Sequence, residues 1–551
     1  MLRFKFTRKK IIFLTSTILI IFIINSIFSS VIENKISEFL LKNESKYYTA
    51  HVESSHFRLL RRSLVLNNLS LTPNQESLDS LMHNDSAKQA LERITLSSVK
   101  FNGIGLINIL FNDKIYIKTL EINDLHIIKI QNAENTKIDK QRKALNLDSI
   151  YIKKLKGFQI DKIAVNDFVY ETVDIESNEI TFKNEPLNFV SSGFKLEEFD
   201  SQLFKLLPVK ESFEISKIEL NINALKYDFS VENIAINFTK KLIAIEKLRL
   251  KPQISKRKLA LSYPFSKDVF DVEIEAFKIH NFNLTKLLNK EGIFIDSVYV
   301  SGLDLGLYKD KRRPFNKNKH KTLPHIALQN SKTPIYIAKI NVEKSNVLIE
   351  EHLEKRDTLL VISLDSINAK IQNITSIKAL SEQPMLVDVT ATLMKKAALK
   401  VHINFPLKHH VQDFSFNGTL GAANLKLFDS ALFPAIGLKV LDGRLISMVF
   451  DATANDDFSN GSMTMRYQGL EAKVFKANSL EKSKFLSWSV NTLIKKSNPT
   501  KKKKARVAVI EFERAKYKGI GNYLWKSLLS GIANSIVPGG KQVKPTNKRN
   551  K

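Results

Sequence analysis

Apolar and polar residues alternate along most of the chain from about residue 94 onward. The clearest runs are Ile218, Leu220, Ile222 and Ala224; Val387, Val389, Ala391 and Leu393; and Leu399, Val401, Ile403 and Phe405. Successive side chains of a strand point to opposite faces, so a period of two predicts strands with one apolar face. Because the third run resumes the alternation shortly after Lys395 and Lys396, we expect the last two runs to form a hairpin.

Two further features indicate how these strands are organised. The alternation slips by one residue at Ser301 and Gly302, which predicts a β-bulge. Short apolar helical turns at 106–110, 203–207 and 284–288 each precede strands, and 425–434 is a looser copy. Their irregular spacing predicts elaborated sets of hairpins of one architecture rather than a solenoid of fixed period.

An apolar sheet face has to be covered by a second sheet, by helices or by an apolar ligand. The pattern predicts too few helices for a helical layer. Tandem sandwiches of two packed sheets and a single curled sheet therefore remain equal alternatives on periodicity alone.

The first residues predict a membrane anchor. Residues Ile11 to Ile32 carry no formal charge, and at about 1.5 Å per residue they would form a helix of roughly 33 Å, enough to span a bilayer. A cleaved signal peptide would have a shorter apolar region, about 7 to 15 residues, followed by a small-residue cleavage site, so we favour an uncleaved anchor. Five basic residues precede the segment, which predicts a cytoplasmic N-terminus and a body on the other side of the membrane.

Composition narrows the function classes. The 551 residues include no cysteine, which excludes disulfides, thiolate metal sites and a cysteine nucleophile. The net charge of +29 is concentrated at the two ends, and residues from Ser483 onward include 17 basic and two acidic side chains. If the tail lies across the membrane, as the charges around the anchor predict, we expect it to contact phospholipid headgroups rather than nucleic acid. A solvated linker is an equal alternative.

The C-terminal tail also contains an amphipathic pattern. Apolar residues including Leu524, Trp525 and Leu528 fall near one face of a predicted helix, with Ser527 and Ser530 opposite. Docking at a membrane interface and capping the end of a groove are both consistent with this pattern. The expected membrane-interface residues are Lys501, Lys502, Lys503, Lys504, Leu524, Trp525, Leu528 and Ile532.

The search for catalytic, cofactor or metal sites finds none. His409 and His410 follow Lys408 in an expected solvated turn. His320 and His325 belong to the basic stretch from Lys309 to His325, which we expect to be a solvated loop, with a loop that attracts lipid headgroups as the alternative. The acidic pair Asp456 and Asp457 is interpreted as a turn. No glycine-rich motif has the spacing of a nucleotide-binding loop. We therefore expect a protein that is not an enzyme and needs no cofactor.

The chain resembles the AsmA-like family. The resemblance lies in the N-terminal anchor, in the repeated short helix followed by alternating strands, and in GRLISMVFDATANDDFSNGSMTMRYQGL from Gly443 to Leu470. The segment YKGIGNYLWKSLLSGIANSIVP is similar to the tail of members from the Bacteroidetes lineage. The expected parts are residues 1–32 as basic flank and anchor, 33–440 as repetitive β groove, 441–494 as closing region, and 495–551 as basic tail with helix.

The resemblance implies a mainly β fold in which one long curled antiparallel sheet forms an apolar groove, interspersed with short helices. With about 25 strands at roughly 4.8 Å each, the groove would extend on the order of 120 Å. It implies a single-pass inner-membrane protein with a periplasmic body that moves phospholipid towards the outer membrane, with a possible outer-membrane or periplasmic partner protein. The expected lipid-lining residues are Ile218, Leu220, Ile222, Val387, Val389, Leu399, Val401 and Ile403. A membrane-anchored scaffold that binds outer-membrane proteins by strand addition is the alternative, and an enzyme of unrecognised type is a remote third.

Overall fold

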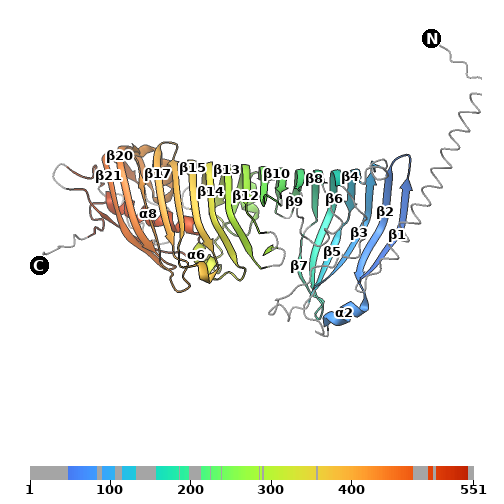
Figure 1. Ribbon diagram of the computed structural model, residues 1–551. Helices are drawn as coiled ribbons and strands as arrows, with labels where there is room; N and C mark the ends of the chain where they lie inside the picture. The colour runs from blue at the N-terminus through green and yellow to red at the C-terminus, as the bar shows by residue number, and fades with distance from the viewer. Residues whose placement is uncertain are drawn as a thin grey trace, which may run out of the picture. The chain divides into compact units, whose positions relative to one another are not determined.

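The computed structural model describes residues 48–82, 90–105, 114–131, 157–184, 186–197, 212–223, 225–237, 239–283, 286–287, 291–354, 358–475, 494–500 and 504–543. Within these residues the protein is mainly β, as expected (Figure 1). No helix among them is both long and apolar enough to span a bilayer. The expected anchor at Ile11–Ile32 and the short turns at 106–110 and 203–207 lie outside the described residues.

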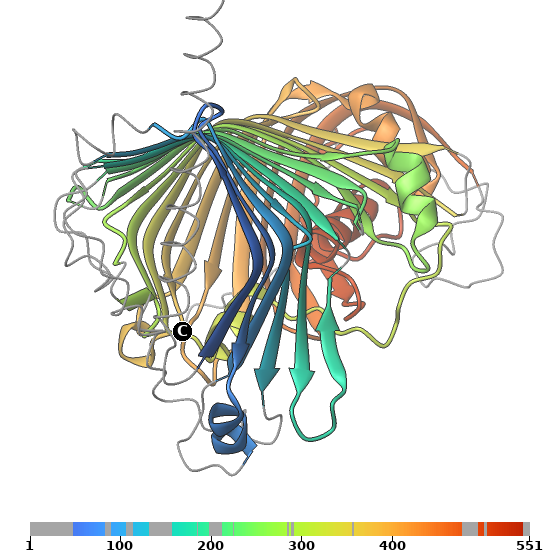
Figure 2. The ribbon, with the colours of Figure 1, turned by 90° about the vertical axis from the view of Figure 1, so that its right-hand side faces the viewer.

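The chain forms two compact units, residues 1–239 and 240–551. Among the described residues the first unit contains the helix α2 (Gln75–Met82; blue in Figure 2) and the following strands: β1 (Tyr48–Arg58), β2 (Ser63–Pro73), β3 (Leu91–Asn102), β4 (Lys114–Asn123), β5 (His126–Gln131), β6 (Gly157–Asp174), β7 (Ile180–Lys183), β8 (Leu187–Glu197), β9 (Ser212–Ile222) and β10 (Tyr227–Asn237). These strands join in one sheet, in which β3 pairs with both β4 and β5, and both of these pair with β6.

The second unit is also built on one sheet. Its strands are β11 (Leu242–Pro252), β12 (Asp268–His280), β13 (Ile293–Asp310), β14 (Ile335–His352), β15 (Leu359–Thr375), β16 (Met385–Leu393), β17 (Ala397–Phe405), β18 (Phe414–Leu420), β19 (Ala423–Asn424), β20 (Leu438–Ala454), β21 (Phe458–Val474) and β22 (Ala508–Glu513). Its helices within the described residues are α4 (Lys256–Ser262), α6 (Pro324–Gln329), η3 (Lys378–Leu380), η4 (Leu425–Phe428), α7 (Asp429–Ile436) and α8 (Ile520–Ile536). The expected part boundary at 440/441 falls inside β20.

The single-sheet alternative therefore describes each unit, and most strand pairs are antiparallel, as expected, although three pairs among the described residues are parallel. Strand β13 pairs with β14 in parallel, and β6 pairs in parallel with β4 and β5. A parallel pair needs a connection that returns to the starting end of the first strand. Residues 311–334, which include α6, make this return between β13 and β14.

The slip in alternation at Gly302 is real, but its cause differs from the expected bulge. Gly302 has a left-handed φ of +65°, yet the register from Ile274↔Leu303 to Ala276↔Ser301 continues without an extra residue. Neighbouring strands contain a left-handed residue near the same level, Lys247 in β11 (φ 49°) and Lys344 in β14 (φ 50°). Because the alternation shifts at the same level in these strands, apolar residues stay paired with apolar residues on both sides of Gly302.

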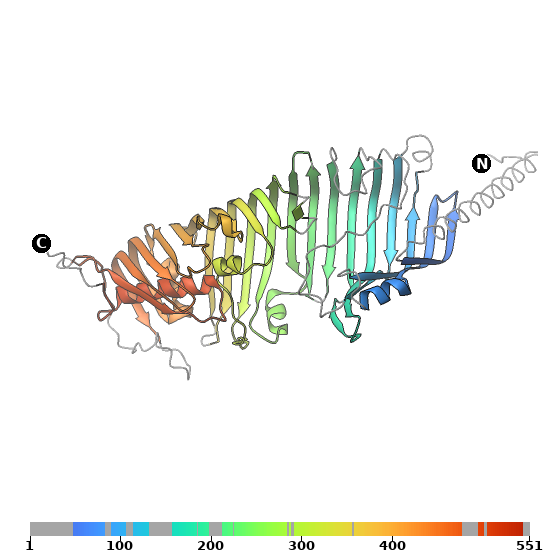
Figure 3. The same cartoon turned by 60° about the horizontal axis from the view of Figure 1, so that its bottom comes forward.

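The expected hairpin of β16 and β17 is present, with Val389 opposite Val401 and Val387 opposite Ile403. The core of the second unit lies at its C-terminal end. Along β20, inward residues such as Leu445 (1% exposed) and Phe450 (2%) alternate with exposed ones, because η4 and α7 pack against β20 while α8 packs against β21 and β22. Figure 3 shows α8 in red lying against the last strands of the sheet.

Candidate functional site

The most distinctive feature of the second unit is a set of apolar rows that cross its sheet from strand to strand. One row, here called row E, places apolar residues at nearly every strand from β11 to β22. Its members are Ile245, Phe277, Val300, Val342, Ala369, Val389, Val401, Gly418, Phe450, Met463 and Ala508. The neighbouring row F consists of Ile243, Ile279, Val298, Ile340, Ile371, Val387, Ile403, Phe416, Ala452, Gly461 and Ile510. Neither row contains a charged residue.

The first unit has rows of the same kind. One row comprises Leu66, Val99, Ile122, Val165, Phe189, Leu220 and Phe229. A second row comprises Phe57, Leu64, Phe101, Leu120, Ile163, Ser191, Ile218 and Val231. Its single polar member, Ser191, is 2% exposed, and its hydroxyl has no hydrogen-bond partner among the residues that the structure describes. Sequence analysis missed this serine, because its place in an apolar row depends on the register.

The residues expected to line a groove fall within these rows. Ile218 and Leu220 belong to the two rows of the first unit, and Ile222 pairs with buried Tyr227. Val387, Val389, Val401 and Ile403 belong to rows E and F, and Leu399 lies between Ala391 and Leu420 in the next row. Most of these side chains are half-buried.

The opposite face of the same strands is polar and exposed. Thr390, Asp388 and Lys400 are exposed, and His402 Nδ1 lies 2.7 Å from Asp388 Oδ1 across the β16–β17 pair. On β16 and β17 the sheet thus has one apolar face and one polar face that is exposed to water and includes this polar contact.

Coverage of the apolar face changes along row E. Every member from Ile245 to Gly418 is half-buried, whereas Phe450, Met463 and Ala508 are 2%, 0% and 0% exposed. Helix α8 covers the last members, since a Cβ at Gly531 would lie 3.0 Å from Met463 Cε and 2.9 Å from Ile510 Cγ1. The β13–β14 crossover adds to this cover, because Leu323 is 0% exposed within the same core. The face is therefore closed at the C-terminal end and partly open over β11 to β17.

The buried face of helix α8 combines small and polar residues with the large side chains of Tyr523, Leu529 and Ile536. The Ser527 and Ser459 hydroxyls are 2.7 Å apart, and Ser530 Oγ accepts a 3.0 Å hydrogen bond from the Glu511 amide. The serines expected opposite the apolar stripe are thus among the residues that pack on the sheet. A period of 3.6 residues in the sequence shows that a helix has an apolar and a polar face, but it does not show which face packs against the rest of the protein.

The expected membrane-interface residues are only partly placed. Leu524, Trp525, Leu528 and Ile532 are half-buried and pack beside the core of the second unit. Lys504 is exposed, and Lys501, Lys502 and Lys503 lie outside the described residues.

Buried polar groups hold α8 and the neighbouring chain in place at the C-terminal end of the second unit. The Arg506 guanidinium donates hydrogen bonds to the carbonyls of Asn534 (2.8 Å) and Pro538 (2.8 Å) at the end of α8. Tyr467, 1% exposed, donates to the Lys495 carbonyl at 3.1 Å, and burial raises its pKa to about 12. These groups bind backbone carbonyls of the fold, so their arrangement indicates a structural role.

The histidine and acidic residues considered as candidates for catalysis or metal binding do not lie together. His409 and His410 are exposed in a turn, as expected, whereas His325 is 0% exposed and stacks on Phe405. Burial lowers the pKa of His325, so its ring is neutral at neutral pH.

Asp456, interpreted from sequence as part of a simple turn, has three basic neighbours: Arg514, His320 at 3.1 Å and Lys516 at 3.3 Å. Arg514 also donates to the Lys321 carbonyl, so this cluster holds the crossover to the end of the sheet. No group of three or more potential metal ligands occurs within the part of the chain that the structure describes.

Comparison with models of known protein families finds no match for this chain, and comparison with curated proteins finds none either.

Proposed function

We propose that this protein binds the acyl chains of phospholipid along the apolar rows of its sheets and moves phospholipid between the inner and outer membranes. In this proposal residues 11–32 anchor the chain in the inner membrane with the N-terminus in the cytoplasm, and the body lies in the periplasm. The proposal requires no catalytic group or cofactor, because a lipid gradient sets the direction.

The observation that carries the proposal is the continuity of row E. Seven strands in succession, β11 to β17, present an apolar side chain that is only half-buried. Exposed apolar surface of this extent is costly in water and is typical of a binding surface. An acyl chain gains about 0.8 kcal/mol for each CH₂ that it buries, so such a surface lowers the cost of taking lipid out of a bilayer.

Lipid content tests the proposal. We expect protein purified without detergent to carry stoichiometric phospholipid in mass spectrometry. A photo-crosslinking residue at Val389 should capture phospholipid, whereas the same residue at Thr390, on the exposed polar face, serves as the matched control. Capture at neither position, with no co-purified lipid, would refute the proposal.

One observation favours the scaffold alternative. Strand β1 pairs with β2 on one side and with no other strand among the described residues, so its second edge is suited to strand addition. The edge of β22 differs, because the Val509 amide donates to the Lys541 carbonyl at 3.1 Å. Protein that lacks lipid but co-purifies with outer-membrane barrel proteins would support the scaffold function.

A further inference from the structure

The connection between β11 and β12, residues 253–267, combines exposed apolar and basic side chains at one end of the strands in the second unit. Ile254, Leu261 and Phe265 are 37%, 37% and 43% exposed. The segment contains four basic residues and no acidic residue. Monomeric proteins rarely place several large apolar side chains together in water unless the surface has a partner.

Helix α4 gives this segment a fixed conformation. Leu259 and Ala260 are 0% and 2% exposed and anchor the helix against the sheet, and Ser255 Oγ accepts a hydrogen bond from the Lys258 amide. Arg313 Nε donates to the Leu261 carbonyl at 3.2 Å. The exposed apolar residues are therefore held on an ordered element, with their backbone positions set by the buried pair.

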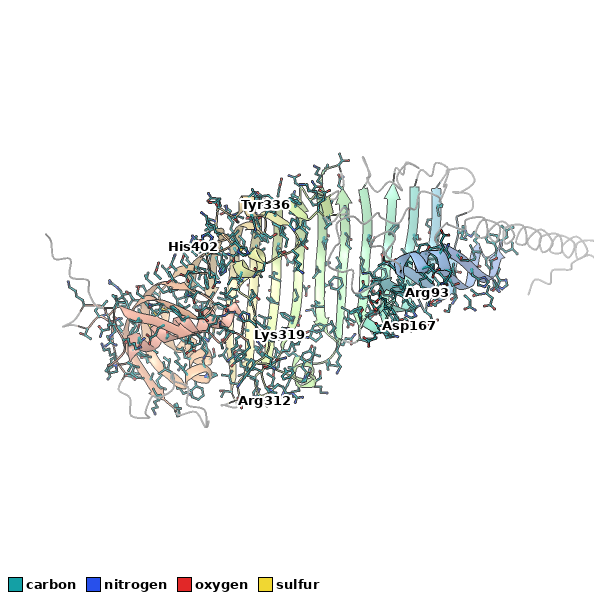
Figure 4. All side chains as sticks on the ribbon, turned by 90° about the horizontal axis from the view of Figure 1, so that it is seen from below. Arg93, Asp167, Arg312, Lys319, Tyr336 and His402 are labelled. Carbon is teal, nitrogen blue, oxygen red and sulfur yellow. The ribbon has the colours of Figure 1, made fainter. Side chains whose placement is uncertain are left out.

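Four acidic residues at this end of the strands each pair with a basic residue, and only one of these basic residues, Lys256, belongs to the segment. Asp268 pairs with Lys309 at 2.7 Å, and Asp310 pairs with Arg312 at 2.6 Å. Figure 4 shows Arg312 at this end and Tyr336 at the opposite end of the strands. Glu350 and Glu351 pair with Lys256 and Lys311.

Three cations of the segment consequently lack an acidic partner among the described residues. Arg257 and Lys258 are exposed on α4, and the Lys267 ammonium lies 4.8 Å from the centre of the Tyr263 ring. Arg313 adds a fourth positive charge next to Leu261, because its partner is a carbonyl. Uncompensated cations around exposed aliphatic and aromatic side chains are complementary to an anionic lipid surface.

We propose that residues 253–267 form a peripheral membrane-binding site, in which Ile254, Leu261 and Phe265 insert among the headgroups of an anionic bilayer while Arg257, Lys258 and Lys267 bind lipid phosphates. This site does not require that the protein move lipid along its sheet. It also differs from the basic C-terminal tail, residues 495–551, which contains β22 and α8.

The absence of cysteine allows a direct test, because Phe265→Cys creates a unique position for an environment-sensitive fluorophore. The full chain, reconstituted in phosphatidylcholine nanodiscs, is mixed with vesicles that contain phosphatidylglycerol or phosphatidylcholine alone. We expect a blue shift and an intensity increase with the anionic vesicles, and quenching by nitroxide-labelled lipid. No spectral change with anionic vesicles, or an equal change with neutral ones, would overturn the proposal.

Charge variants in the labelled background test the cations. Each basic residue near an anionic surface contributes about fivefold in affinity, so Arg257→Gln with Lys258→Gln should weaken vesicle binding roughly 30-fold. Lys395→Gln with Lys396→Gln is the matched control, since that exposed turn lies at the same end of the strands and adds no exposed large apolar residue. Equal losses in the two pairs would show that only the overall charge acts and would refute a local site. Unchanged circular dichroism confirms that the variants fold, since Leu259 and Ala260 are retained.

Discussion

The contrast between the open and closed parts of row E leads to a quantitative prediction. Val389 and Met463 belong to the same row, but Val389 is half-buried and Met463 is 0% exposed beneath α8. In Met463→Asp the new carboxylate has no water and no partner, so we expect a loss of about 4 kcal/mol or more in the free energy of unfolding. In Val389→Asp the carboxylate keeps contact with water, so the loss should be about 1 kcal/mol, similar to an unfavourable substitution in a strand.

Urea unfolding of the full chain measures this difference. Trp525 on α8 reports the unfolding of the second unit, and Trp488→Phe removes the other tryptophan. With a slope of roughly 3 kcal/mol/M, Met463→Asp should lower the midpoint by more than about 1 M and Val389→Asp by less than about 0.5 M. Val389→Asp should also reduce the bound phospholipid of the purified protein, whereas Val389→Leu should retain it. Equal midpoint losses in the two Asp variants would refute the reasoning, because they would show that β16 is packed as tightly as β21.

Three further predictions concern the closed end of the second unit. Gly531→Leu should destabilise the packing of α8 by about 1 to 3 kcal/mol, because the new side chain would meet closely packed neighbours. Gly521→Leu should not, because nothing lies within 4 Å of a Cβ at that position. Thermal unfolding of the two variants measures the difference. His325 has a lowered pKa in the folded state, so its contribution to the free energy of unfolding should be complete above the unfolded-state pKa of about 6.5 and should be lost as the pH falls below that value. Urea titrations at several pH values should show a weaker pH dependence for His325→Phe. A variant that retains the full dependence would assign it to another group. Arg506→Ala removes hydrogen bonds to the last carbonyls of α8 and should cost about 2 to 3 kcal/mol, which amide hydrogen exchange at the end of α8 would register as faster exchange; unchanged protection there would contradict it.

The sequence by itself determined the strands and their two faces. Val387, Val389 and Val401 could be assigned to one apolar face because side-chain direction alternates with a period of two, which is a local property of the backbone. The hairpin at Lys395 and Lys396 followed from the same local signal, and α8 followed from a period of 3.6. The resemblance to the AsmA-like family and the function that it implies stay predictions.

Only the tertiary structure decided which strands are neighbours and what covers the apolar face. The parallel pairing of β13 with β14 depends on the path of residues 311–334, and a pattern of alternation is the same for parallel and antiparallel strands. The orientation of α8 was also undetermined, since Ser527 and Ser530 find partners on β21 and β22 that are remote in sequence. Row E exists because successive registers bring one apolar residue of each strand to the same level. Periodicity determines the sheet face on which a residue lies, whereas strand pairing and coverage depend on contacts between distant segments. Those contacts make the same row a closed core at Met463 and a half-open surface at Val389.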